Sequence, residues 1–268
     1  WSAWKETFTT AETAKLQELV NIPLTEAQLD RLMAARPWSV REKAVSYGSI
    51  ERTVTEQDRT LYALCRPPRL LELIHRFMLY DAGEKKIARY QQYFCVTKII
   101  NRIQRTQEDG TRQGGVVWHT QGSGKSLTMV MLAEAIALDT DIDNYKIILV
   151  TDRVDLDDQI YKTFYHCGTL PVQAKTGKHL AELLQDNKAR IITAVIDKFE
   201  TAVGKTGVRD DNPDIFVLVD ESHRGQYGEL HAKMKNTLPN ACFIGFTGTP
   251  VMKKDRNTIN RFGGLIDT

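Results

Sequence analysis

The chain has 268 residues, of which 42% are hydrophobic and 26% are charged, so it can form a sizeable core and is not a disordered polymer. The formal net charge is only +2, which excludes a uniformly basic chain and means that any DNA-binding surface must be local. Four cysteines form no Cys-x-x-Cys pair, and no apolar run has the length of a membrane span. We therefore expect a protein of the reducing cytoplasm with no membrane partner.

Residues 1–80 have the apolar spacing of helices and contain no chemical motif. The segment 23–33 begins like a capped helix, and 69–79 has a strong amphipathic pattern after two prolines. Residues 85–103 predict a further helix. We expect a helical segment at 1–80, followed by a second domain at 81–268.

From residue 116 the pattern alternates between short apolar runs and helical spacing. Strands are predicted at 116–119, 146–151, 190–195, 215–219 and 241–246, and helices at 125–138, 155–165, 178–186 and 228–237. Such alternation is typical of an α/β fold in which helices cover both faces of a parallel sheet.

A glycine-rich string, Gln121-Gly122-Ser123-Gly124-Lys125-Ser126, follows the first of these strands and precedes a helix. Glycine lets the backbone approach phosphate closely, and the helix start favours an anion. Lys125 is positioned to reach the β- and γ-phosphates, and Ser126 to bind Mg²⁺. The strict pattern has glycine where His119 stands, so an ordinary Gly-Ser turn before a helix is the alternative.

A carboxylate pair, Asp220 and Glu221, follows the uninterrupted apolar run 215–219, at the strand end where open α/β sheets bind ligands. Asp220 would hold Mg²⁺, and Glu221 would orient and deprotonate the attacking water. His223 would couple this site to its neighbours. The alternative is an acidic loop that caps a core strand.

A third polar string, Thr247-Gly248-Thr249-Pro250, follows the strand predicted at 241–246. It places two hydroxyls beside a glycine at the same edge of the sheet. An ordinary Gly-Pro turn is the alternative. The three strings together predict an ATP site.

Read in order, these strings resemble those of superfamily 2 helicases and translocases and, more narrowly, the motor (R) subunits of type I restriction enzymes. The resemblance runs from about residue 85 to the end of the chain. It rests on the strings 118–126, 150–159, 220–228, 245–250 and 262–264. It implies a RecA-like P-loop domain that uses ATP and Mg²⁺.

The resemblance also implies roles for single residues. Gln92, or Gln91 by a shift of one position, would read adenine. Arg153, Thr193 and Lys198 would contact DNA, although Asp152 could simply cap a helix and Lys198 could be a surface charge. The implied nucleotide-binding residues are Gln92, Thr120, Gly122, Ser123, Gly124, Lys125, Ser126, Thr247 and Thr249.

The function that we expect is ATP-driven translocation of double-stranded DNA, in a complex with modification (M) and specificity (S) subunits. Segment 1–80 would then follow a nuclease domain, which we expect to be absent from this chain together with the second motor domain. The alternatives are another superfamily 2 helicase or restriction motor, an ATP-binding regulatory module without motor activity, and a P-loop kinase or transferase.

Overall fold

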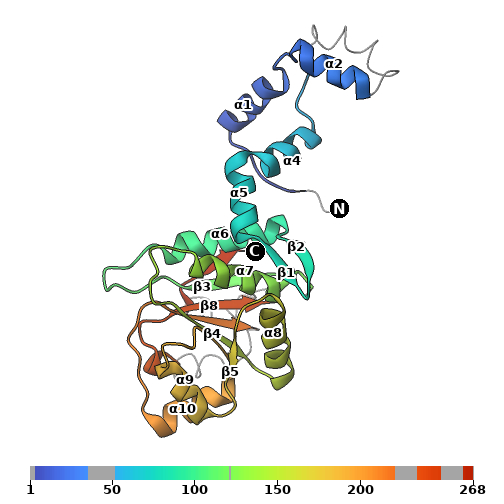
Figure 1. Cartoon of the computed structure of the whole chain (residues 1–268). Helices are drawn as coiled ribbons and strands as arrows, with labels where there is room; N and C mark the ends of the chain where they lie inside the picture. The colour runs from blue at the N-terminus through green and yellow to red at the C-terminus, as the bar shows by residue number, and fades with distance from the viewer. Residues whose placement is uncertain (1–3, 36–51, 121, 221–233, 249–261, 268) are drawn as a thin grey trace. The chain divides into compact units, whose positions relative to one another are not determined.

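The computed structural model describes residues 4–35, 52–120, 122–220, 234–248 and 262–267 (Figure 1). The chain divides into two compact units, Trp1–Glu72 and Leu73–Thr268. The functional domains predicted at 1–80 and 81–268 stay a prediction. Within the described segments, no helix has both the length and the apolar character needed to cross a membrane.

The first unit is built from short helices that are stabilised by capping boxes and ion pairs. Thr9 and Thr55 form capping boxes at two helix starts, with Glu12 and Asp58 respectively. Glu6 accepts hydrogen bonds from Arg66 at 2.8 Å and from Arg69 at 2.9 and 3.0 Å. The helices are α1 (Thr10–Val20), α2 (Glu26–Ala35), α4 (Glu56–Cys65) and the first residues of α5 (Pro67–Arg76).

Two predicted helices form, but their predicted bounds extended too far. The helix expected over 69–79 ends at Arg76, and the helix expected over 85–103 begins only at Tyr90, as α6 (Tyr90–Ile103). Between them, β1 (Met78–Asp81) pairs antiparallel with β2 (Glu84–Ile87). The connecting residues Ala82 and Gly83 have φ values of 50° and 85°, which a helix does not allow.

The second unit contains a seven-stranded sheet in the order β5-β6-β4-β7-β8-β3-β9, with every neighbouring pair parallel. The α/β parallel-sheet prediction is therefore confirmed. Residues 215–219 are fully enclosed in the central strand, as their uninterrupted apolar sequence requires. The strands are β3 (Gly115–Trp118), β4 (Lys146–Thr151), β5 (Val172–Gln173), β6 (Ile191–Val195), β7 (Ile215–Asp220), β8 (Cys242–Thr247) and β9 (Leu265–Asp267).

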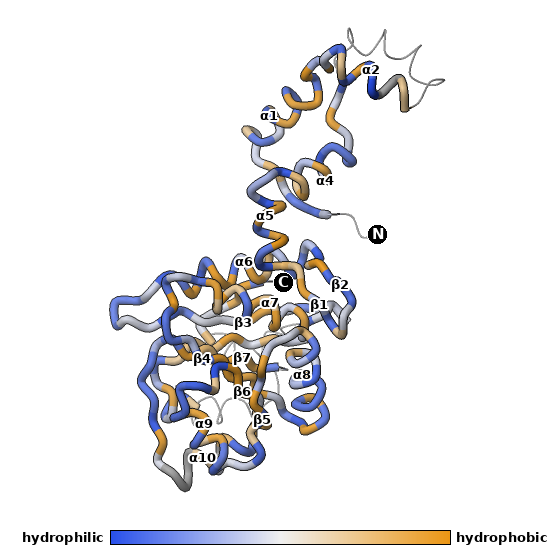
Figure 2. The backbone as a smooth tube through the Cα atoms, in the orientation of Figure 1, coloured by the Kyte–Doolittle hydropathy of each residue, from blue (hydrophilic) through white to orange (hydrophobic). Residues whose placement is uncertain are grey.

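Two groups of helices pack around this sheet (Figure 1). Helices α7 (Lys125–Ala137) and α8 (Val154–His166) pack together, and α7 also packs on α6. Helices α9 (Gly177–Gln185) and α10 (Ile196–Thr206) form the other group, in one buried cluster with Ile148 of β4 and other strand residues. Figure 2 shows the hydrophobic colour concentrated along the strands between them.

The helices predicted at 125–138, 155–165 and 178–186 correspond to α7, α8 and α9 within one or two residues. Three elements, α10, β5 and β9, were not predicted from the sequence. Of the helix predicted at 228–237, residues 234–237 are helical, and the rest lie outside the described residues.

Candidate nucleotide-binding site

The described residues of the predicted motifs lie at the carboxyl ends of three neighbouring strands, β3, β8 and β7. β8 lies between β7 and β3, with Asp220 paired to Phe246 and Trp118 paired to Thr247 in the register. Asp220 ends β7 and Thr247 ends β8. The backbone N–H of His119 donates to the Thr247 carbonyl at 3.0 Å, which ties the start of the glycine loop to the end of β8.

Two glycines after Thr120 have a backbone conformation that suits a phosphate-binding loop. Gly122 and Gly124 have φ values of 76° and 83°, in the left-handed region that favours glycine. The Ser123 N–H donates to the Thr120 carbonyl at 3.2 Å and closes the turn. A Cβ added at Gly124 would lie 2.8 Å from Nε2 of Gln92, whereas one at Gly122 would meet no described atom within 4 Å.

The residues present fit a bound polyphosphate. The first N–H groups of α7 lack acceptors within the helix, and its first turn, which begins with Lys125 and Ser126, contains no acidic side chain. Ser123 Oγ is buried and has no hydrogen-bond partner among the described residues, so a phosphate oxygen would satisfy it. Donors and positive charge thus converge at this loop, as phosphate recognition requires.

Gln92, the predicted adenine reader, lies buried under the loop. Its Oε1 accepts from the Arg89 N–H at 2.9 Å, and its Nε2 donates to the Gly124 carbonyl at 3.2 Å. Gln91 is exposed. The structure therefore gives Gln92 a definite contact with the phosphate loop, and the role of either residue in adenine recognition stays a prediction.

The structure describes only some of the residues predicted to bind metal or to act in catalysis. Asp220 is half-buried at the end of β7, and Thr247 is 1% exposed at the end of β8. A serine hydroxyl at Ser126 and a carboxylate at Asp220 are oxygen ligands of the kind that Mg²⁺ prefers. Glu221, His223 and Thr249 lie outside the described residues.

The three predicted DNA-contacting residues have different surroundings. The Arg153 side chain is 62% exposed, 3.7 Å from the Asp152 carboxylate. Lys198 donates to the Ala174 carbonyl at 2.6 Å and lies 4.0 Å from the fully buried Asp157 carboxylate. Thr193 is fully buried in β6. These placements favour structural roles for Lys198 and Thr193 and leave Arg153 as the accessible candidate.

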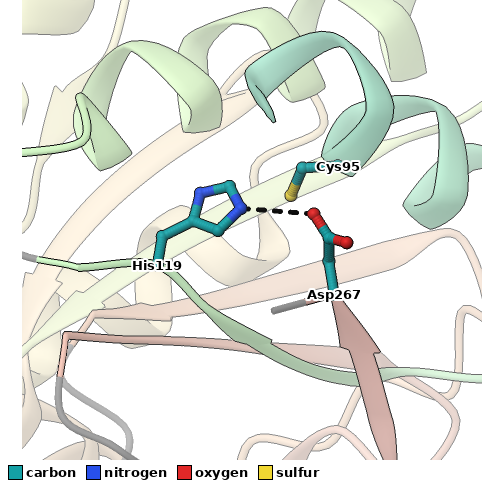
Figure 3. Close-up of side chains that lie close together, drawn as sticks. All are labelled: Cys95, His119 and Asp267. Atoms are coloured by element: carbon teal, nitrogen blue, oxygen red, sulfur yellow. Dashed lines mark hydrogen bonds and ion pairs between the residues drawn. The ribbon is translucent and has the colours of Figure 1, made fainter. Parts of the chain in front are cut away.

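One cluster beside the phosphate loop had no signal in the sequence. His119 Nε2 lies 3.2 Å from Asp267 Oδ2, and Lys98 Nζ lies 2.5 Å from Asp267 Oδ1. Figure 3 shows His119 and Asp267 facing each other, with the Cys95 thiol beside them. Burial raises the pKa of Asp267, but hydrogen bonds from His119 and Lys98 outweigh burial, so the pKa lies below its ordinary value.

The Cys95 thiol is enclosed in the same cluster. Burial, reinforced by the nearby Asp267 carboxylate, raises its pKa well above the ordinary value, so the thiol stays protonated.

Two similar known proteins are endonuclease subunits of type I restriction enzymes, one of them putative. The chain is 36% identical over 236 residues to a type I restriction enzyme HindI endonuclease subunit of Haemophilus influenzae, covering 79% of this chain and 22% of that protein. It is 34% identical over 220 residues to a putative type I restriction enzyme MjaIXP endonuclease subunit of Methanocaldococcus jannaschii, covering 79% and 21%. The chain thus spans about a fifth of the length of these relatives. The predicted resemblance to type I restriction subunits is confirmed.

Among solved structures, the helicase domain of Pyrococcus furiosus Hef superposes with a TM-score of 0.51 at 21% identity, covering 66% of this chain and 37% of that chain. This likeness supports the fold alone. Residues 91–268 match the SWI2/SNF2 ATPase family over a stretch that includes the phosphate loop, Asp220 and Thr247. The chain belongs to the SWI2/SNF2 ATPase family.

Proposed function

We propose that this chain is the ATP-binding first motor domain of a type I restriction enzyme R subunit, and that it couples ATP hydrolysis to translocation of double-stranded DNA. The observation that carries the proposal is the glycine loop. It has two left-handed glycines, a buried Ser123 hydroxyl with no hydrogen-bond partner among the described residues, and a helix start without acidic side chains, at the same sheet edge as Asp220. The names of the two restriction-enzyme relatives support the biological setting.

In this proposal the triphosphate lies against the N-terminus of α7. The loop N–H groups and Lys125 would bind the phosphates, and Ser126 and Asp220 would hold Mg²⁺, which would neutralise phosphate charge. Glu221 takes the proton of the attacking water. Thr247 and Thr249 would lie at the γ-phosphate side, and His223 would connect the carboxylates to neighbouring segments.

The proposed partners are double-stranded DNA and the M and S subunits. DNA is held through its phosphates, because a motor must pass every sequence and phosphate is uniform along the track. The 268-residue chain alone should turn over ATP slowly, since an arginine finger from a second motor domain would be worth about 10³-fold or more.

The test is ATP turnover by the intact protein with and without duplex DNA. We expect stimulation by DNA, and loss of turnover by about a hundredfold or more in Lys125→Ala, which removes a charge that stabilises the transition state. Glu221→Gln should bind ATP and stall. Turnover that DNA does not change would favour the regulatory module, and transfer of phosphate to a small acceptor would favour a kinase.

A further inference from the structure

His119 connects strand β3 of the sheet to the phosphate loop. It directly follows β3 and precedes Thr120, and its backbone N–H is held by the Thr247 carbonyl. Its side chain, in a residue that is 7% exposed, reaches Asp267 of β9 at 3.2 Å. Asp267 is 148 residues further along the chain, so this contact connects the loop to a distant segment.

The hydrogen bond has a definite direction. Asp267 has a lowered pKa and is ionised at neutral pH, so its oxygens accept. His119 Nε2 must therefore donate this hydrogen bond, which orients the imidazole ring. A charge-assisted bond in a residue pair that is less than 10% exposed resists displacement by water.

Helix α6 supports the same loop from a second direction. Its Lys98 holds Asp267 Oδ1, and its Gln92 donates to the Gly124 carbonyl at the other end of the loop. Hydrogen bonds thus hold the loop at both ends: at His119 to Asp267 of β9, and at Gly124 to Gln92 of α6. β9 itself pairs with β3, and the register shifts between Val116 and Val117.

Cys95, His119 and Asp267 also have the composition of a metal-ligand set, with candidate ligand atoms within 4.8 Å of one another. Two observations favour a hydrogen-bonded cluster. Asp267 Oδ1 already binds Lys98, and Asp267 Oδ2 already binds His119.

We propose that Asp267 is a positioning residue for ATP, acting through His119, and that β9 is thereby an input that sets the affinity of the phosphate loop for nucleotide. The inference rests on the proposed function, because it assigns the effect to ATP at that loop. A displacement of β9 breaks the His119 bond, releases the start of the loop and weakens phosphate binding without touching Lys125.

The test is steady-state ATP turnover by the intact protein carrying Asp267→Asn, His119→Gln or both. We expect Asp267→Asn to raise KM for ATP about tenfold, the size of one hydrogen bond to a charged group. The kcat should change less than about twofold, since loop binding is shared by ground and transition states. The double variant should be no worse than the worse single variant, because both break one contact.

The matched control is Asp214→Asn. The Asp214 carboxylate accepts a hydrogen bond from Arg112 Nε at 2.8 Å, in another partly buried ion pair. Asp214 lies just before β7, away from the carboxyl edge of the sheet. It should lower the melting temperature as Asp267→Asn does and leave KM for ATP unchanged. If Asp267→Asn fails to fold, Lys98→Ala, at a side chain that is 55% exposed, loosens the same carboxylate and should raise KM about threefold.

An unchanged KM in the folded variants, or additive effects of His119→Gln and Asp267→Asn, would overturn the proposal. So would one equivalent of zinc in the wild-type protein that Cys95→Ala removes, since the cluster would then be a metal site. Lys125→Ala serves as the reference: normal turnover in that variant would sink the proposed function itself, whereas its loss together with an unchanged KM in Asp267→Asn would sink only the positioning role.

Discussion

Of the strand-to-helix junctions at the carboxyl edge of the sheet, those after β3, β4 and β6 differ in the charge at the helix start. The junction from β3 to α7 begins at Gly124, with no side-chain cap and no acid in the first turn. The junction from β4 to α8 has Asp155 and Asp157 in the first turn, and α10 has Asp197. An acidic first turn already satisfies the positive helix end, so α7 is the one of these three helices that is left for an external anion.

One polar side chain of each acidic junction, Asp157 after β4 and Lys198 after β6, is engaged within the fold. Asp157 is fully buried, accepts from Gln173 at 2.9 Å and lies 4.0 Å from Lys198. Lys198 in turn donates to the Ala174 carbonyl. A position at the carboxyl edge is therefore not enough to make a ligand site. The charge and the unsatisfied donors of the junction decide whether it binds a ligand or holds the fold.

The largest effect that separates these junctions is expected from Gly124→Ala. The φ of 83° strains alanine by about 1–2 kcal/mol, and its Cβ would meet Gln92 Nε2 at 2.8 Å. We expect ATP affinity to fall more than about tenfold by displacement of the loop. Gly168→Ala is the matched control, because its φ is 84° and an added Cβ meets no described atom within 4 Å. Equal ATP binding by both variants, measured by titration, would contradict this reading.

Lys198→Ala should destabilise the fold by about 1–3 kcal/mol, because it takes a charged partner from the buried Asp157 and leaves the Ala174 carbonyl without its donor. Lys178→Ala is the control: its side chain is 84% exposed, with Glu182 at 3.9 Å, and it should change stability by less than about 0.5 kcal/mol. Chemical denaturation measures both. No difference between them would return Lys198 to the role of a surface charge.

The pH dependence should differ between Asp157 and Asp267. Burial raises the pKa of Asp157, and the hydrogen bond from Gln173 does not offset it. Its contribution to stability is present below the ordinary carboxyl pKa of about 4 and is lost as pH rises through the raised value. The pKa of Asp267 is lowered, so its contribution is present above about 4 and is lost as pH falls through the lowered value.

Denaturation of the Asn variants between pH 3 and pH 7 tests this contrast. As pH rises, the stability of Asp157→Asn relative to wild type should increase, whereas that of Asp267→Asn should decrease. Slopes of the same sign for both variants would show that the two carboxylates have similar environments, against the contacts described above.

The sequence predicted those parts of the molecule whose signal is local. Continuous apolar runs gave β4, β7 and β8, and the glycine string gave the loop and the start of α7. The β1–β2 hairpin was mistaken for helix, because Met78 and Leu79 continue the apolar period of α5 and only the Ala82-Gly83 turn reveals the strand pairing.

The hydrogen bond between His119 and Asp267 could not be predicted, for a different reason. β9 is three residues long, and its pairing with β3 and the contact of Asp267 with His119 join segments about 150 residues apart. No periodicity or spacing encodes such a contact. The same holds for Lys198, whose partners Asp157 and Ala174 come from other elements, so that its sequence position suggested a DNA contact or a surface charge.

The smallest expected effect concerns DNA. Arg153 is the predicted DNA-contacting residue that has an exposed side chain, at 62%, and it lies at the carboxyl edge after β4. If it contacts one phosphate, Arg153→Ala should reduce the slope of log affinity for duplex DNA against log salt concentration by about 0.9 on any sequence, with little change in stability.

Lys188→Ala is the control, and it should leave this slope unchanged. Lys188 is an exposed cation before β6, at the opposite edge of the sheet. The measurement is DNA affinity of the intact protein at several salt concentrations on two unrelated duplexes. The acids around Arg153, Asp152 and Asp155, argue for a weak contact, so a slope that Arg153→Ala does not change would mean that this junction, like its neighbour after β6, serves the fold alone.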